Sequence, residues 1–291
     1  MEKLSFDQLL DAGVHFGHLR RKWNPNMAPY IFMEKNGIHI IDLYKTQAKL
    51  DEAAKAMKQI AKNGKRILFV ATKKQAKEIV SELVKPTNMP YVTERWPGGM
   101  LTNFVTIRKA VKKMSSIDKL ATTPQYLNLS KRERLQITRE RAKLEKNFGS
   151  IADLSKLPSA IFVVDINKEH IAIAEAKKLN IPTFAIVDTN TDPNLIDFPI
   201  PGNDDASKSI AVIMEYVTKS INEGLTERKI EREKAQADEK ASKAKAREKK
   251  DAAAKAKAEA TDDAKTEKPS EEKEGTEKRP RKRLAKKAEN E

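Results

Sequence analysis

The chain of 291 residues contains no cysteine. Disulfide frameworks and thiolate zinc sites are therefore excluded, and any metal ion would have to bind through histidine and carboxylate ligands. Long apolar runs are missing too, because no stretch approaches the roughly 18 apolar residues of a membrane-spanning helix. Residues 1–7 have neither the apolar stretch nor the cleavage pattern of a signal peptide. We therefore expect a soluble, cytoplasmic protein that does not contact membranes.

Familiar catalytic motifs are also absent. There is no Gly-x-Ser-x-Gly elbow and no His-Glu-x-x-His, and residues 63–66 lack the first glycine and the Ser/Thr of a phosphate-binding loop. The remaining enzyme hypothesis is a metal-dependent phosphotransfer or phosphatase site built from Asp165, Asp188 and Asp204, since carboxylates on one metal ion can position a phosphoryl group. No acid–base constellation stands out, so we expect a protein that is not an enzyme.

Aromatic residues are scarce, and residues 225–291 contain none. That segment has 22 Lys and Arg against 17 Asp and Glu, with only Leu225, Ile230 and Leu284 as large aliphatic residues. It cannot bury enough apolar surface to fold alone, so we expect a charged tail that is partly helical or disordered. Its basic end, 279–287, would suit a tether to RNA.

The rest of the chain is basic. Without the tail, the 57 Lys and Arg and the 42 Asp and Glu fall to 35 and 25. A surplus of that size indicates a polyanionic partner, because cations that displace counterions from phosphates supply affinity that does not depend on sequence.

Short apolar strands alternate with helical patterns before residue 102 and after residue 151. Expected strands are 38–42, 67–71, 91–93, 160–165 and 183–188, and amphipathic helices follow most of them. The continuous apolar run at 67–71 is typical of a buried parallel strand. This pattern predicts an α/β body formed by 1–102 and 151–224.

Residues 95–103 (the pivot) separate the body from a helical insertion. Pro97, Gly98 and Gly99 end a strand and permit positive φ, and Thr102 or Asn103 then caps the next helix. A plain strand-to-helix connection is the alternative interpretation.

Residues 103–150 are expected to form a basic helical hairpin. The first helix has an apolar seam at spacings of three and four, formed by Phe104, Ile107, Val111, Met114 and Ile117. Ser130 and Glu133 form a capping box for the second helix. The other faces are basic, which suits contact with RNA, although charged helix faces are often simply solvated.

Residues 20–30 mix cations, aromatic residues and two prolines, and are predicted to be irregular. The mixture suits a phosphate backbone with bases lying on rings, although inward packing of Trp23 and Tyr30 is the better interpretation for the aromatics.

Aspartates end two of the predicted strands, where doubly wound folds place ligands. His18 with Asp188, Asp204 and Asp205 would suit one hard divalent ion. Capping by the aspartates is the simpler alternative and is preferred for each of them singly.

Four motifs in order, within 13–18, 23–46, 95–103 and 188–205, resemble those of the bacterial small-subunit ribosomal protein two family. The resemblance covers about residues 4–224. It implies a flavodoxin-like parallel sheet with helices on both faces and an inserted coiled-coil hairpin, and a non-enzymatic component of the small ribosomal subunit. It also implies contact with small-subunit ribosomal RNA and with neighbouring proteins, including ribosomal protein one, which holds messenger RNA. A metal near His18, Asp188 and Asp204 is reported for some members. The long tail departs from the family.

We therefore expect a ribosome-bound structural protein that requires no cofactor, with a single divalent ion as an open alternative, and that is not a homo-oligomer. A protein adaptor, in which docking of neighbours matters more than RNA, is the second hypothesis. The residues expected to bind RNA are Arg20, Arg21, Lys22, Trp23, Arg95, Asn103, Arg108, Lys109, Lys112, Lys113, Arg132 and Arg134.

Overall fold

The computed structural model describes residues 4–262, with side chains through 236 except for those of 125 and 127. The chain divides into two compact units, Met1–Glu233 and Lys234–Glu291. Within the described part, no helix is both long and apolar enough to cross a membrane. The predicted basic cluster at 279–287 lies outside the described residues.

The first unit contains a five-stranded parallel sheet. Its strands are β4 (Ile67–Val70), β5 (Tyr91–Val92), β6 (Ala160–Val164), β7 (Thr183–Val187) and β8 (Phe198–Pro201). They lie in the order β5-β4-β6-β7-β8 and every neighbouring pair is parallel. The second strand in chain order thus lies outside the first and the others follow on the opposite side, which is the flavodoxin-like order. The predicted fold class is confirmed.

Strand β8 was not predicted, because Pro199 and Pro201 interrupt its sequence. Proline cannot donate to a ladder and is tolerated mainly in edge strands. β8 is an edge strand, and Phe198 stacks on Phe184 of β7 with ring centroids 4.5 Å apart.

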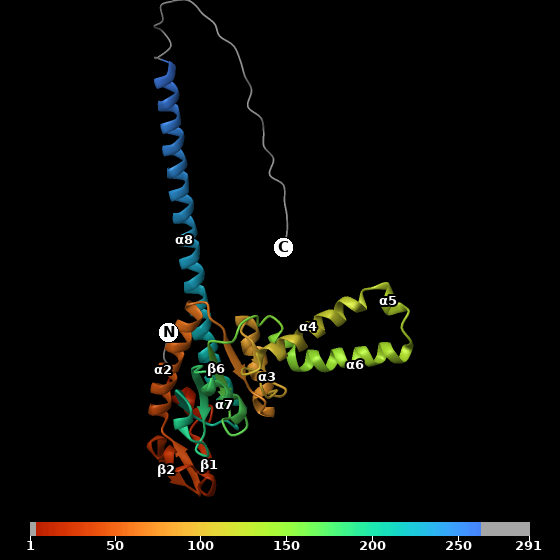
Figure 1. Ribbon diagram of the computed structural model, residues 1–291. Coiled ribbons are helices and arrows are strands. Elements are labelled where there is room, and N and C mark those ends of the chain that lie inside the picture. The colour runs from red at the N-terminus through yellow and green to blue at the C-terminus, as the bar shows by residue number, and fades with distance from the viewer. Residues whose placement is uncertain (1–3, 263–291) are drawn as a thin grey trace, which may run out of the picture. The chain divides into compact units, whose positions relative to one another are not determined.

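Helices cover both faces of this sheet (Figure 1). On one face, α2 (Leu43–Lys62), α3 (Lys74–Val84) and the first part of α8 (Ser207–Asp262) pack on residues such as Phe162 and Phe184. On the other face, α7 (His170–Lys178) and the pivot pack on Ile161 and Val163. Alternate residues of the strands therefore pack into two separate hydrophobic cores, one on each face of the sheet.

A second, antiparallel sheet precedes the parallel one. It contains β1 (Phe16–Leu19), β2 (Ile31–Lys35) and β3 (Ile38–Ile41) in the order β1-β3-β2. The predicted strand at 38–42 thus exists but does not belong to the main sheet. Asn36 and Gly37 both have positive φ, as a two-residue hairpin turn of matching twist requires.

The segment at 20–30 is not irregular as predicted. It forms two short 3-10 helices, η1 (Arg20–Lys22) and η2 (Pro25–Tyr30). Pro25 occupies the first turn of η2, where its missing N–H is not needed, whereas Pro29 lies inside that helix. Helix α1 (Phe6–Asp11) precedes β1, and Ser5 and Gln8 form its capping box. Three further 3-10 turns are η3 (Lys85–Thr87), η4 (Gly149–Ile151) and η5 (Pro193–Leu195).

Residues 103–150 contain α4 (Phe104–Ala121), the short α5 (Pro124–Leu127) and α6 (Lys131–Phe148). Helices α4 and α6 lie side by side and extend away from the sheet (Figure 1). Ile107 and Ile117 of the predicted seam are buried, and the capping box of Ser130 and Glu133 is present. Ion pairs also join the two helices, namely Lys113 with Glu140 and Asp118 with Arg141. A coiled coil in the strict sense and the domain boundaries stay predictions.

Helix α8 does not end at Gly224, although glycine is a common helix stop. A Cβ at this position would lie 2.5 Å from the carbonyl oxygen of Lys58, so glycine permits α8 to approach α2. Ion pairs from Lys58 to Glu223 and Glu227 follow the same contact. The helix continues to Asp262.

One buried carboxylate holds the pivot. Glu175 of α7 is 8% exposed and accepts hydrogen bonds from Trp96 Nε1 at 3.1 Å and from the amides of Gly99, Leu101 and Thr102 at 2.7, 2.9 and 3.1 Å. The Thr102 hydroxyl donates a fifth at 3.2 Å. Gly99 has φ +83, a conformation that L side chains rarely adopt and that turns successive amides toward one point. The start of α4 is thereby fixed to the body.

We expect Glu175→Gln to destabilise the first unit by about 2–3 kcal/mol, because the amide cannot accept five hydrogen bonds as the carboxylate does. Burial alone would raise the pKa of Glu175, but these donors hold it below its ordinary value of 4.5. The stability it contributes is therefore present above pH 4.5 and is lost as the pH falls through the lowered pKa. Urea unfolding across this range measures the effect.

The matched control is Glu82→Gln, on an exposed glutamate of α3. It should leave stability within about 0.5 kcal/mol of the wild type. A Glu175→Gln protein as stable as this control at pH 7, or a difference that grows toward acid pH, would contradict the assignment.

Candidate nucleic-acid interface and polar cluster

Charged side chains gather at the carboxyl ends of the parallel strands. Lys73 follows β4, Asp165 follows β6, Asp188 follows β7, and Asp204 and Asp205 follow β8. Carboxyl ends of parallel strands share one edge of a sheet, so residues separated by up to 132 positions come together there. His18 reaches the same place from β1.

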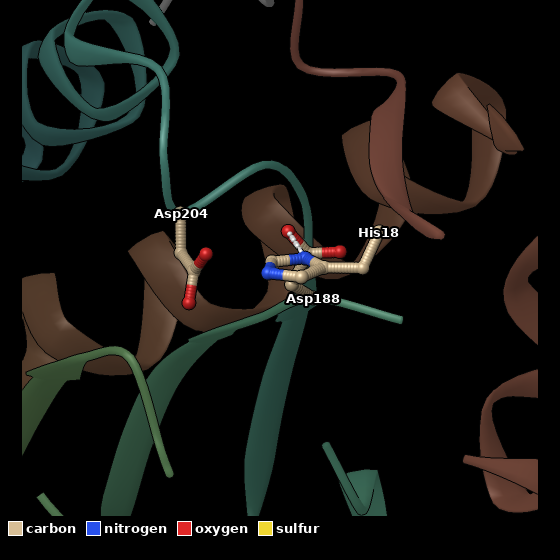
Figure 2. A group of neighbouring side chains, drawn as sticks. All are labelled: His18, Asp188 and Asp204. Carbon is tan, nitrogen blue, oxygen red and sulfur yellow. Dashed lines mark ion pairs between the residues drawn. The ribbon is translucent and has the colours of Figure 1, made fainter. Parts of the chain in front are cut away.

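The imidazole of His18 lies between carboxylates (Figure 2). Its Nδ1 is 2.9 Å from Asp188 Oδ2 and its Nε2 is 3.3 Å from Asp205 Oδ2. Lys73 Nζ lies 2.9 Å from Asp204 Oδ1, 2.7 Å from Asp205 Oδ1 and 3.6 Å from Asp165 Oδ2. The four residues predicted as metal ligands are therefore neighbours, and we name them with Lys73 and Asp165 the polar cluster.

The cluster shifts the pKa values of its members. Burial, with the nearby charges of Asp188 and Asp165, raises the pKa of Asp204 to about 7. Burial opposes the charged form of Lys73, but hydrogen bonds to Asp205 and Asp204 outweigh it and raise the pKa to about 12. The contact with Asp188 raises the pKa of His18. Lys73 is thus a fixed internal cation, whereas Asp204 exchanges its proton near neutral pH.

Capping explains some of the acidic residues in this region. Asp192 accepts the amide of Asn194 at the start of η5, as the capping alternative predicts. That alternative is wrong for Asp204 and Asp205, because Asn203 accepts the amides of Asp205 and Ala206 in their place.

The donor set suits a divalent ion. Ligand atoms of His18, Asp188 and Asp204 lie within 4.8 Å of one another, and both carboxylates are only 1% exposed. Imidazole nitrogens and carboxylate oxygens are both ligands of zinc, and carboxylate oxygens also bind hard divalent ions. Lys73 contacts Oδ1 of Asp204, which leaves the second oxygen for an ion.

The antiparallel sheet docks on the same edge. Thr189 accepts the His18 amide through Oγ1 and the Asn24 amide through its carbonyl, both at 2.8 Å. Gly17 allows this approach, since a Cβ there would lie 2.6 Å from Thr189 Cγ2. Lys73 and Thr189 were not predicted as members of the site. Their only sequence signal is their position directly after an apolar strand.

The predicted RNA-binding residues of the N-terminal segment lie at the surface. Arg21 and Lys22 are exposed, and Arg20 makes an ion pair with Glu34 at 3.6 Å. Trp23 is 38% exposed, with its ring centroid 5.1 Å from that of His39. It therefore packs on one side and remains open on the other.

The predicted RNA-binding residues of the hairpin differ in whether they make contacts within the protein. Lys109, Lys112 and Arg132 are exposed, and none makes an ion pair with another described residue. Lys113 pairs with Glu140, and Arg108 donates to the carbonyl of Ser155 at 2.7 Å. Arg134 is half-buried. Exposed cations without an ion pair to a described residue therefore remain on both helices.

The two pivot residues have different roles. Arg95 is exposed without an ion pair to any described residue. Asn103 occupies the N-cap position of α4 as predicted, but its Oδ1 accepts the Thr106 hydroxyl at 2.9 Å and caps no backbone amide.

Comparisons with known proteins identify the family. The family model described as ribosomal protein S2 matches residues 9–224. The chain is 64% identical over 249 residues to small ribosomal subunit protein uS2 of Parabacteroides distasonis, covering 86% of this chain and 90% of the relative. The protein of the same name from Porphyromonas gingivalis is 68% identical over 232 residues, covering 80% and 83%, and that of Flavobacterium johnsoniae is 66% identical over 237 residues, covering 81% and 93%. The chain therefore belongs to the ribosomal protein S2 family, whose members are structural ribosomal proteins and not enzymes.

Proposed function

We propose that this protein is a ribosome-bound, cytoplasmic component of the small ribosomal subunit that anchors to ribosomal RNA mainly through its helical hairpin. One observation carries the proposal: α4 and α6 lie side by side, with Ile107 and Ile117 of α4 buried, and both helices carry exposed cations without an ion pair to a described residue. Cations without an internal partner can contact phosphates without first breaking an ion pair. The release of counterions from the RNA then supplies the affinity. The body docks as a single copy beside RNA and neighbouring proteins.

Neutralising Lys109, Lys112, Arg132 and Arg139 to glutamine should weaken binding to small subunits depleted of this protein. It should also lower the slope of log affinity against log salt by about 3–4, because each lost phosphate contact removes about 0.9. Sedimentation binding at several salt concentrations measures both. The body should unfold as in the wild type, since all four residues are exposed.

A control variant with Lys35, Lys55, Lys85 and Lys178 changed to glutamine removes the same net charge from exposed positions of the body. Equal losses in the two variants would show that total charge, and not the hairpin, governs binding. An unchanged hairpin variant would remove the hairpin as the anchor.

An apolar surface favours a protein neighbour in addition to RNA. Phe6, Leu10, Phe32, Met33 and Tyr44 are all exposed, the largest fractions being 71% for Phe32 and 70% for Tyr44. With other apolar residues they line a pocket of about 280 Å³. Large exposed apolar patches mark protein interaction sites, and this one contains no cation for phosphates. Ribosomal protein one is the partner that this surface is proposed to hold.

Phe32→Asp should weaken binding of purified ribosomal protein one at least tenfold, because an exposed aromatic anchor is replaced by a charge. Calorimetric titration with the isolated proteins measures it. Val105→Asp is the matched control, since Val105 is 68% exposed but lies on the hairpin. In a separate experiment, retention of ribosomal protein one by this protein after RNase treatment would support direct contact. Equal binding of ribosomal protein one by both variants would assign that partner to another surface.

The polar cluster is proposed to hold one divalent ion that fastens β1 to the ends of the parallel strands. His18 belongs to the antiparallel sheet, whereas Asp188 and Asp204 follow strands of the parallel one. An ion shared by all three would stabilise the docking of the two sheets and would have no catalytic role.

Zinc titration should give one site per chain and should raise the unfolding temperature, since a ligand that binds only the folded state stabilises it. Affinity should fall as the pH drops through about 7, because the pKa values of Asp204 and His18 are raised and both must lose protons to ligate. Asp188→Asn should weaken binding at least tenfold, whereas Asp192→Asn should not. Absence of saturable binding of zinc, manganese or magnesium would exclude the site.

A further inference from the structure

A small pocket lies where the hairpin joins the body. It has a volume of about 250 Å³ and is lined by Arg95, Pro97 and Gly98 of the pivot and by Asn147 and Phe148 of α6. It therefore combines the outgoing and returning ends of the insertion, which are 49 to 53 residues apart in sequence. Glu175 holds the pivot wall, and Phe148 packs against the core cluster that contains Trp96, so both walls are attached to the body.

The polar groups of this pocket are not used by the protein. Within the described part of the chain, the Arg95 guanidinium makes no ion pair and the Asn147 amide makes no hydrogen bond. The nearest acidic residue in sequence, Glu94, is neutralised by Lys77 at 3.2 Å and Lys146 at 3.3 Å. The pocket thus offers a free cation and a free amide beside a half-buried phenyl ring.

Gly98 and Gly99 differ in whether the structure requires glycine at their positions. Gly99 has positive φ, so its backbone requires glycine. Gly98 does not have positive φ, and a Cβ built there would meet no atom within 4 Å. Neither conformation nor internal packing excludes a side chain at 98. Because Gly98 lines the pocket, a side chain there would extend into the open space beside this wall.

We infer that this pocket receives one unpaired nucleotide of the small-subunit ribosomal RNA. The base lies against the ring of Phe148, where aromatic stacking accepts any base, and the Asn147 amide hydrogen-bonds its edge. Arg95 and the exposed amide of Gly98 contact the adjoining phosphate. The inference rests on the proposed RNA anchoring and adds a fixed point to it, since a single occupied pocket sets the register of the hairpin along the RNA.

This chemistry favours a nucleotide over a peptide. A single flat base fits a small pocket with one aromatic wall, and a neighbouring phosphate satisfies the guanidinium, which no apolar peptide side chain would do. The pocket is also separate in sequence and structure from the apolar surface of α1, β2 and α2.

The test uses full-length Gly98→Val and Asn147→Ala with small subunits depleted of the wild-type protein. Chemical probing of the RNA with dimethyl sulfate and a 2′-hydroxyl reagent should show an unpaired nucleotide that the wild type protects. Gly98→Val should lose that protection and about tenfold in affinity, because base stacking is lost, while hairpin protections remain. Asn147→Ala should weaken the same protection. Gly98→Ala, which adds one methyl group, should lie between wild type and Gly98→Val.

Two controls keep the outcomes separate. Asn222→Ala, on an exposed asparagine of α8, should match the wild type, and amide exchange at Gly99, Leu101 and Thr102 should show that Gly98→Val keeps the pivot intact. If the wild type binds but Gly98→Val gives the same footprint and affinity, the pocket is not a nucleotide site and the hairpin anchoring stands. If the wild type itself does not bind, both fail.

Discussion

The hydrogen bonds of Glu175 are the interaction on which the arrangement of this protein depends. Five donors from Trp96, Gly99, Leu101 and Thr102 converge on one buried carboxylate. Without it, three backbone amides and an indole N–H would be left unsatisfied between the sheet and the hairpin, which is costly in a buried site. The cations of α4 and α6 are therefore presented from a fixed base. The position of the two hairpin helices is therefore set inside the body, by a buried carboxylate of α7.

A doubly wound sheet with this strand order offers a ligand crevice at the carboxyl ends of its strands. Here the crevice is occupied by the protein. Lys73 extends its ammonium to Asp165, Asp204 and Asp205, and β1 lies across the edge with His18 against Asp188. The carboxylates that an enzyme hypothesis would assign to phosphoryl transfer are thus engaged internally. The fold keeps its shape while side chains of the protein itself fill the crevice where such folds hold a substrate, which accords with a family of structural proteins.

Patterns decided by local chemistry could be predicted from the sequence. The apolar runs of β4, β6 and β7, Ile107 and Ile117 of the seam, and the capping box at Ser130 all appear in the structure. Features decided by tertiary contact could not be predicted. The two prolines of β8 argue against a strand in the sequence, although the segment forms an edge strand. Glu175 has the sequence context of an ordinary charged residue on an amphipathic helix, and only the folded structure shows that it binds the pivot. Likewise, the aspartates could be grouped from strand ends, but Lys73 is a cation that only the assembled sheet places among them.

Rigidity links these observations. A flexible arm would have to lose conformational freedom on binding RNA, and that ordering would reduce the affinity that its cations supply. The chain does this ordering during folding: Gly99 turns the backbone, Glu175 gathers its amides, and the ion pairs of Lys113 and Arg141 join the two helices. The same ion pairs neutralise Lys113 and Arg141, whereas other exposed cations, such as Lys109 and Arg132, make no ion pair with a described residue. The cations that pair within the hairpin are thus different residues from those without an internal partner, so the ion pairs that stabilise the hairpin do not reduce the charge that we propose contacts RNA.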